Sequence, residues 1–198
     1  MTVLVGWIES ALDVLWVGWM VYWAGQPLFD YARGRAKEVT RKGRGNLQSY
    51  ILLIAGFAVL QISFTGPLTF LGVGFLPNTL PVVTVGLVLA VAGLAFSVWA
   101  RVYLGSNWSP SAMLKKGQDL VTTGPYAIVR NPIYLGLTVA MIGTGIVFGG
   151  YRVIISIACV ALFSWLRTRE EEKLMSEQFG ERYAEYKERV SAFIPRVI

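Results

Sequence analysis

The sequence of residues 133–166 is IYLGLTVAMIGTGIVFGGYRVIISIACVALFSWL, and its only charged residue is Arg152. Two glycines, a tyrosine and this arginine at positions 149–152 separate two apolar stretches, which is typical of a tight turn between antiparallel helices. Each stretch is shorter than the roughly 20 apolar residues that a helix needs to cross a bilayer. We therefore predict a helical membrane hairpin whose helices continue into the polar sequence on either side.

Three more apolar stretches precede this hairpin, at residues 3–24, 47–66 and 81–100. The first has neither the basic start nor the small-residue cleavage site of a secretory signal, so we count it as a span. With 55% hydrophobic and 15% charged residues, the chain lies outside the composition of soluble globular domains. We predict an all-α polytopic membrane protein with about five transmembrane helices in a single domain, 1–198. Three spans lie in 1–100, and two spans with their polar segments lie in 101–198.

Basic residues indicate how these spans are oriented in the membrane. Apart from Arg152, the 18 lysine and arginine residues all lie in three polar segments, 26–46, 101–132 and 167–198. Basic residues concentrate on the cytoplasmic side of membrane proteins. We therefore expect these segments in the cytoplasm and the N-terminus outside, in the cytoplasmic membrane of a prokaryote. The connection at 67–80, broken by glycine and proline, is then either extracellular or re-entrant.

Composition also narrows the possible partners and sites. The net charge of +6 follows from the topology and from attraction to anionic lipid headgroups, and aromatic residues lie mostly in spans, so we expect no nucleic-acid partner. The single cysteine, Cys159, lies within a span and leaves no disulfide possible within the chain. The chain has no histidine, the commonest metal ligand, and we expect no metal site. The sequence does not determine the oligomeric state.

The polar segment before the hairpin ends in LVTTGPYAIVRNPIYLG, residues 120–136. Glycine and proline recur throughout 105–132, which excludes one long helix and favours a series of turns. Pro132 suits the first turn of the next helix, with Asn131 as its cap. A helix N-terminus attracts anionic groups, and Arg130 beside it strengthens that preference. Taken singly, these residues are also explained by an ordinary loop with an arginine and tyrosines at the lipid headgroups.

A second polar segment, RTREEEKL at 167–174, follows the last span. Its spacings of three and four residues place four side chains on one helical face: Arg167, Glu170, Glu171 and Leu174. We interpret Glu172 and the charged residues after it as a solvated, salt-bridged helix surface. Apolar side chains continue the same spacing and should pack the terminal helix against the protein or the membrane surface: Phe179, Tyr183, Tyr186 and Val190.

Together with FGERYAEYKERV at 179–190 and Ile194-Pro195, these motifs resemble the isoprenylcysteine carboxyl methyltransferase family, which groups with the phospholipid-amine methyltransferases. The resemblance covers residues 101–195, whereas the N-terminal half is similar only in consisting of spanning helices. It implies that 101–198 is the catalytic half. It also implies S-adenosylmethionine as the methyl donor, held at the cytoplasmic face, and a lipophilic carboxylate or amine acceptor that arrives from the bilayer.

The resemblance implies roles for individual residues as well. The expected cofactor-binding residues are Trp108, Leu120, Val121, Gly124, Tyr126, Arg130, Asn131, Pro132, Tyr134 and Glu170. Among these, Arg130 would meet the cofactor carboxylate, a glutamate its ammonium, and the aromatic rings its adenine or sulfonium. The expected catalytic residues are Arg167, which would orient a carboxylate acceptor, and Glu171 beside it. Both of these side chains are also suited to the cofactor.

One residue departs from the family pattern. The chain has Asn131 where the family motif has histidine. Asparagine keeps a neutral hydrogen bond but cannot carry a proton or a positive charge. The departure indicates either an altered acceptor or an altered cofactor site.

Two other classes of function compete with methyl transfer. An NADPH-dependent reductase of a lipid or sterol, similar in fold, should surround its cofactor phosphates with more basic residues than Lys115, Lys116 and Arg130. A small transporter or membrane scaffold should carry several ionisable residues within its spans. Only Glu9 and Asp13, both in the first span, meet that description.

Overall fold

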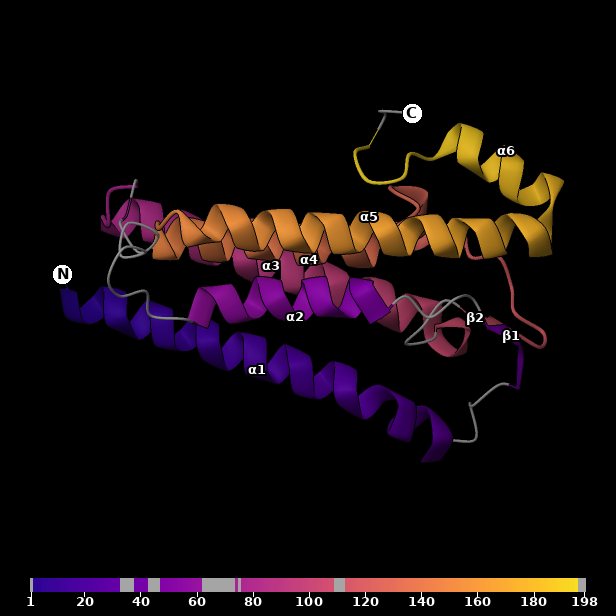
Figure 1. The fold of residues 1–198 in the computed structure, drawn as a ribbon, viewed down its shortest axis with the longest axis horizontal. Coiled ribbons are helices and arrows are strands. Elements are labelled where there is room, and N and C mark those ends of the chain that lie inside the picture. Colours follow the sequence, from indigo (N-terminus) through magenta and orange to yellow (C-terminus); the bar gives the residue numbers. More distant parts are fainter. Residues whose placement is uncertain are drawn as a thin grey trace.

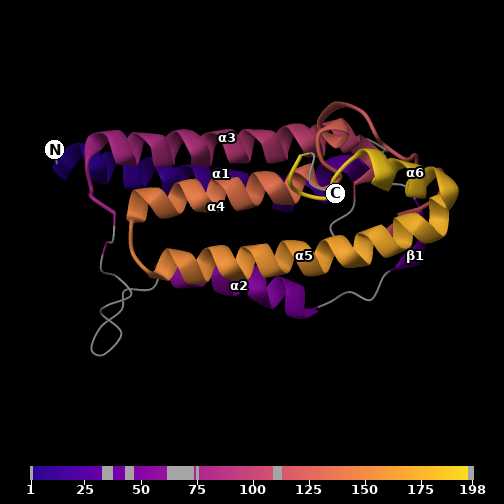
Figure 2. The same ribbon diagram turned by 90° about the horizontal axis from the view of Figure 1, so that it is seen from above.

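A computed structural model describes residues 2–32, 38–42, 47–61, 74, 76–108 and 113–195. Its elements in chain order are α1 (Thr2–Ala32), β1 (Val39–Lys42), α2 (Leu47–Gln61), α3 (Leu80–Leu104), the 3-10 turn η2 (Gly105–Asn107), β2 (Met113–Lys115), the 3-10 turn η3 (Gly124–Ala127), α4 (Pro132–Phe148), α5 (Arg152–Phe179) and α6 (Glu181–Arg189). Helices α1 to α5 form a bundle in which successive helices run in opposite directions (Figure 1). The N-terminus and the α4–α5 turn lie at one end of the bundle and α6 lies at the other (Figure 2).

Helices α3 and α4 pack closely because glycines line their interface. A β-carbon on Gly93 would lie 2.5 Å from the backbone oxygen of Gly136, and one on Gly143 would lie 2.4 Å from the backbone nitrogen of Ala90. Small residues allow such close backbone contact between membrane helices. The contact holds α3 and α4 side by side.

Two tryptophans of α1 attach this helix to α3 and α4. The indole nitrogen of Trp16 donates to Oγ1 of Thr144 at 3.0 Å, and that of Trp19 donates to Oγ of Ser97 at 2.9 Å. Trp16 also packs edge-on against Phe57 of α2, with ring centroids 4.8 Å apart. A buried donor without a partner is costly, so these pairings favour one rotation of α1 against the bundle.

The hairpin predicted at 133–166 is present. Gly149 follows α4 in the left-handed conformation, with φ of 66°, and α5 begins at Arg152. Helix α5 continues through the polar motif to Phe179, as predicted. Helix α4 does not extend on its polar side, because Pro132 disfavours helical geometry in the residue before it.

Two features of the structure differ from the predicted spans and the predicted all-α fold. Helix α1 reaches Ala32, beyond the predicted end of the first span. Strand β1 pairs antiparallel with β2, so a small sheet accompanies the helices. Strands of four and three residues are too short to give a period-two signal in the sequence. The end of the second predicted span and most of the connection at 67–80 lie outside the described residues.

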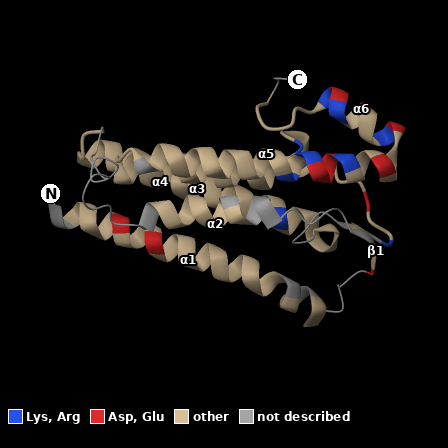
Figure 3. Cartoon of the chain, in the orientation of Figure 1, with Lys and Arg blue, Asp and Glu red and all other residues tan. Residues whose placement is uncertain are grey.

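The described helices differ in how well they suit a membrane. Leu4–Gln26 and Leu80–Asn107 are long and apolar enough to cross one, and Pro132–Phe148 is a shorter apolar helix. Most charged residues of the described chain gather at the end of the bundle that carries α6 (Figure 3). Glu9 and Asp13 lie in the first half of α1. The bundle therefore has one largely apolar end and one charged end.

Candidate functional site

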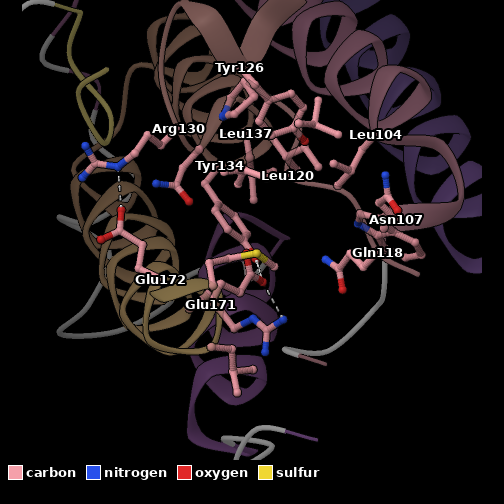
Figure 4. Close-up of a pocket in the computed structure, with 18 of the residues that line it drawn as sticks. Leu104, Asn107, Gln118, Leu120, Tyr126, Arg130, Tyr134, Leu137, Glu171 and Glu172 are labelled. Carbon is pink, nitrogen blue, oxygen red and sulfur yellow. Dashed lines mark hydrogen bonds and ion pairs between the residues drawn. The ribbon is translucent and has the colours of Figure 1, made fainter. Parts of the chain in front are cut away.

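A cavity of about 420 Å³ lies at the charged end of the bundle, which is a volume typical of small-molecule sites. Side chains from all six helices, α1 to α6, and from the loop between α3 and α4 line it (Figure 4). The lining residues are Trp19, Trp23, Ala24, Leu53, Leu104, Asn107, Trp108, Gln118, Asp119, Leu120, Val121, Tyr126, Arg130, Asn131, Pro132, Ile133, Tyr134, Leu137, Phe163, Arg167, Glu171, Glu172, Leu174, Met175, Tyr183 and Tyr186.

One wall of the cavity holds an ion-pair network centred on Arg130 (Figure 4). Its Nε donates to Oε1 of Glu172 at 3.0 Å, and its Nη1 donates to the backbone oxygens of Lys187, at 3.1 Å, and Val190. Nζ of Lys187 lies 3.7 Å from the other oxygen of Glu172. The side chains of Arg130 and Glu172 are only 10% and 18% exposed. The network therefore joins the loop before α4 to both α5 and α6.

A second polar group centres on Glu171. The hydroxyl of Tyr134 donates to its Oε1 at 2.6 Å, and Nη2 of Arg167 donates to the same oxygen at 2.9 Å. Burial raises the pKa of Glu171 above its ordinary value of 4.5, although the charge of Arg167 and the bond from Tyr134 oppose the rise. Among the described residues both bonds use Oε1, which leaves Oε2 for a ligand.

Arg167 is the most buried charged side chain of this group, with 2% exposure. It lies on the same helical face as its two partners, with Nη1 3.8 Å from Glu170 and Nη2 2.9 Å from Glu171. The predicted shared face of this motif is thereby confirmed. Such a buried arginine holds the carboxylates in place, since an unpaired charge there would be costly.

The segment after α6 pairs with the two residues that precede α4. The backbone nitrogen of Arg130 donates to the oxygen of Ser191 at 2.8 Å, and that of Asn131 donates to the oxygen of Ala192 at 3.1 Å. The side-chain amide of Asn131 donates to the same oxygen at 3.3 Å. Asn131 occupies the predicted cap position of α4, but its side chain makes no cap bond and donates to the C-terminal segment instead.

Helix α6 packs against the protein, which is one of the two alternatives that the sequence left open. Gly180, with φ of 52°, separates it from α5 and lets the chain fold back. Tyr183 and Tyr186 are buried, and the hydroxyl of Tyr186 donates to the backbone oxygen of Tyr126 at 2.6 Å. Burial raises the pKa of Tyr126 and of Tyr186, so both hydroxyls stay protonated and can donate.

Part of the cavity lining is apolar. It includes one side chain from each of four helices: Trp19 of α1, Leu53 of α2, Leu137 of α4 and Phe163 of α5. Leu137 and Phe163 belong to the buried core, and the other two pack against it. The cavity therefore connects a charged wall to the hydrophobic interior of the bundle.

All of the residues predicted from the sequence line this cavity except Gly124 and Glu170. Gly124 instead shapes the loop, since its φ is +60° and a β-carbon there would lie 2.6 Å from the ring of Tyr103. Glu170 pairs with Arg167 from outside the lining. Two motifs separated in the sequence thus meet in one cavity, and their individual roles stay predictions.

The interpretation of Glu172 as a solvated surface residue is wrong, because this side chain lines the cavity and pairs with Arg130.

Among the lining residues that were not predicted from the sequence are Trp19 and Trp23 of α1. Tryptophans four residues apart in an apolar helix are typical of a core or a lipid contact, so no signal marked them as part of a site. Asn107 and Gln118, which face the charged wall from across the cavity, were missed for a similar reason (Figure 4). Both amide side chains lie between α3 and α4, where the sequence has no helical or strand spacing that would mark them.

Residues 81–182 match the phospholipid methyltransferase family, and the chain belongs to that family. The protein-S-isoprenylcysteine O-methyltransferase of Schizosaccharomyces pombe is 34% identical over 102 residues, which cover 50% of this chain and 43% of that relative. The nickel-cobalt-cadmium resistance protein NccN of Alcaligenes xylosoxydans xylosoxydans is 28% identical over 116 residues, which cover 58% of this chain and 50% of that relative. The chain thus spans about half the length of these curated relatives.

The eukaryotic intramembrane Ras methyltransferase ICMT, an isoprenylcysteine carboxyl methyltransferase, is similar in structure. The TM-score is 0.53 and the sequence identity 26%, over 77% of this chain and 53% of that one. These comparisons confirm the resemblance that the motifs indicated. Among the described residues, no group of three or more aspartate, glutamate, cysteine or histidine side chains is arranged to hold a metal ion.

Proposed function

We propose that this protein transfers the methyl group of S-adenosylmethionine to a lipophilic carboxylate or amine that enters the cavity from the bilayer. Membership of the phospholipid methyltransferase family supports methyl transfer. The cavity supports a polar cofactor beside a lipophilic acceptor, since its lining combines charged side chains with apolar ones. The activity for which the S. pombe relative is named, O-methylation of isoprenylcysteine, makes a carboxylate the first acceptor to test.

The net charge of the cavity lining is the observation that best supports S-adenosylmethionine as the cofactor. Its lining contains two cationic side chains, Arg130 and Arg167, and three acidic ones, Asp119, Glu171 and Glu172. When all are ionised, the lining has one net negative charge. S-adenosylmethionine has a sulfonium, an ammonium and a carboxylate, and therefore one net positive charge. Attraction between opposite charges is strongest where water is excluded, so the lining favours this cofactor over NADPH, which carries several phosphates.

Each part of the cofactor has suitable partners in the lining. Arg130 and the amides next to Pro132 suit the carboxylate, although Nε and Nη1 of Arg130 already serve Glu172 and the C-terminal segment. Oε2 of Glu171 suits a cationic group. Apolar and aromatic side chains of the loop suit the adenine: Trp108, Leu120, Val121 and Tyr126. Gly124 and Glu170 support the site by shaping the loop and holding Arg167.

The bound cofactor would supply a methyl group activated by a positively charged sulfur. The task of this chain is then to align the acceptor and to exclude water, because a carboxylate is already nucleophilic. Arg167 would orient that acceptor, with Glu171 beside it. An amine would first have to lose a proton, and Glu171, with its raised pKa, suits that role.

We also propose that all five long helices cross the membrane, with the N-terminus outside and the cavity open to the cytoplasm of a prokaryote. The alternating direction of the helices supports an odd number of crossings (Figure 1). The charged end of the bundle carries the basic residues of α6 and those of α5 except Arg152, which supports a cytoplasmic position for it (Figure 3).

Isothermal titration calorimetry of the purified full chain in detergent tests the proposal. S-adenosylmethionine and its demethylated product, S-adenosylhomocysteine, should both bind, whereas NADPH should not. Binding of NADPH without either sulfur nucleoside would contradict the proposal and favour a reductase.

A further inference from the structure

Asp119 differs from the other acidic side chains of the cavity lining. The other two are each paired with an arginine, Glu171 with Arg167 and Glu172 with Arg130. Asp119 is exposed, and within the described part of the chain its carboxylate makes no hydrogen bond or ion pair. Such a carboxylate can accept hydrogen bonds from a ligand without giving up a protein partner.

Contacts on both sides of the loop position the backbone of Asp119. Its backbone nitrogen donates to Oδ1 of Asn107 at 3.4 Å, which ties together two parts of the loop between α3 and α4. Gly117, with φ of 65°, turns the chain just after β2. Strand β2 is itself held in place, because Leu114 packs against Leu174 of α5. Asp119 is therefore presented at the cavity by an ordered loop, which lowers the entropy cost of binding a ligand there.

Asp119 is adjacent to the side chains that suit the adenine. Leu120 and Val121 follow it directly in the chain and line the same cavity. Its neighbours Asn107 and Gln118 face the charged wall from across the cavity (Figure 4). In S-adenosylmethionine the ribose joins the adenine to the sulfur. A carboxylate that is next to the adenine pocket and across from the charged wall is therefore well placed for the ribose.

We propose that Asp119 binds the ribose of the cofactor, with its carboxylate oxygens accepting hydrogen bonds from the 2′ and 3′ hydroxyls. A carboxylate has two acceptor oxygens, and hydrogen bonds to it are stronger than those between neutral groups. An acidic side chain makes the same kind of bond to a ribose hydroxyl in dinucleotide-binding folds. This inference rests on the proposed methyl transfer and adds a cofactor contact that the sequence motifs did not indicate.

The same carboxylate disfavours a phosphorylated ribose. NADPH carries a phosphate in place of the 2′ hydroxyl of its adenosine, and two anionic groups in contact repel each other. Sites for that phosphate use an arginine instead. The basic residue nearest in the sequence, Lys116, is outside the cavity lining, and its Nζ lies 3.6 Å from Glu38. Asp119 thus gives a local reason for the choice of cofactor, in addition to the net charge of the lining.

The test compares S-adenosylhomocysteine with its 2′,3′-dideoxy analogue by calorimetry on the full chain in detergent. Neither ligand has a sulfonium or a net charge, so a change in the charge of the lining alone has little effect on either. The wild type should bind S-adenosylhomocysteine at least about tenfold more tightly, the effect of a hydrogen bond to a charged group. Asp119→Ala should bind both ligands equally and should bind the analogue as the wild type does, which shows that the site persists.

Asp13→Ala serves as the matched control, because Asp13 is an exposed aspartate of α1 outside the cavity lining, and it should keep the wild-type preference. A wild type without this preference would overturn the role of Asp119. So would an Asp119→Ala variant that keeps the preference, or that loses the same factor for both ligands. If the wild type bound neither S-adenosylmethionine nor S-adenosylhomocysteine, the proposed methyl transfer would fail, and this inference with it.

Discussion

At the scale of single residues, Glu171 and Arg130 distinguish a cofactor site from a structural salt-bridge network. Glu171→Gln and Arg130→Ala should each weaken S-adenosylmethionine binding about tenfold or more, because each removes a charge that faces the cavity. Glu188→Gln, on the exposed side of α6, should change it by less than about twofold. Calorimetry measures the affinities, and thermal unfolding of each variant checks that the fold persists. Equal effects at all three positions would place the cofactor elsewhere.

The raised pKa of Glu171 predicts a pH dependence of cofactor binding. The ionised carboxylate attracts a cationic ligand and the protonated form does not, so affinity should fall as the pH is lowered through the raised pKa, which lies above 4.5. Folding raises this pKa, so the carboxyl's contribution to the free energy of unfolding is present at low pH and is lost as the pH rises through it. Because the cation binds the ionised carboxylate, cofactor binding at a pH near this pKa should release protons from Glu171.

Titrations of S-adenosylmethionine in buffers of different ionisation enthalpy measure the number of protons released. Glu171→Gln should abolish the release, while Glu188→Gln should keep it. A release that persists in Glu171→Gln would assign the titrating group to another residue.

Asn131 makes a structural contact in addition to lining the cavity. Its side chain donates to Ala192 and so holds the C-terminal segment against α4. A histidine can donate the same bond, so this contact does not require asparagine. What asparagine removes is a titratable group from the cavity lining.

At the scale of elements, the interface of α3 and α4 depends on glycine. Gly143→Ala places a β-carbon where backbone atoms of Ala90 and Gly86 would lie within 2.5 Å, so the helices must separate. Overpacking of this kind costs about 1–3 kcal/mol, and a lower melting temperature and weaker cofactor binding should follow.

Gly18→Ala is the matched control for this substitution. A β-carbon on Gly18 meets no atom within 4 Å, and alanine favours the helix, so stability should be unchanged or slightly higher. Thermal unfolding followed by circular dichroism compares the two variants. Equal melting temperatures would show that α3 and α4 tolerate separation.

At the scale of the whole molecule, the orientation in the membrane can be tested with single cysteines. In a Cys159→Ser background, Tyr151→Cys lies in the α4–α5 turn and Glu188→Cys on α6, at opposite ends of the bundle (Figure 2). A membrane-impermeant maleimide should label Tyr151→Cys in intact bacterial cells and Glu188→Cys only after lysis. The reverse pattern would invert the topology, and labelling of both in intact cells would contradict the proposed crossings.

The class of fold and the two motifs of the site were predictable because they rest on local patterns. Long apolar stretches indicate membrane helices wherever they occur, and the two glycines within 149–152 indicate a turn without any tertiary contact. Spacings of three and four put Arg167 and Glu171 on one face before any tertiary contact forms. The small β1–β2 sheet was not predictable, since its strands are short and pair across more than 70 residues of chain.

The sequence by itself determined that this chain forms membrane helices with polar motifs at one end, because hydrophobicity and helical period are properties of neighbouring residues. Only the tertiary structure decided which side chains share the cavity. It moved Glu172 from a surface role to a partner of Arg130, and it brought Trp23 of α1 beside Trp108. The physical reason is that helix packing, here set by glycine contacts and buried hydrogen bonds, joins residues distant in the chain.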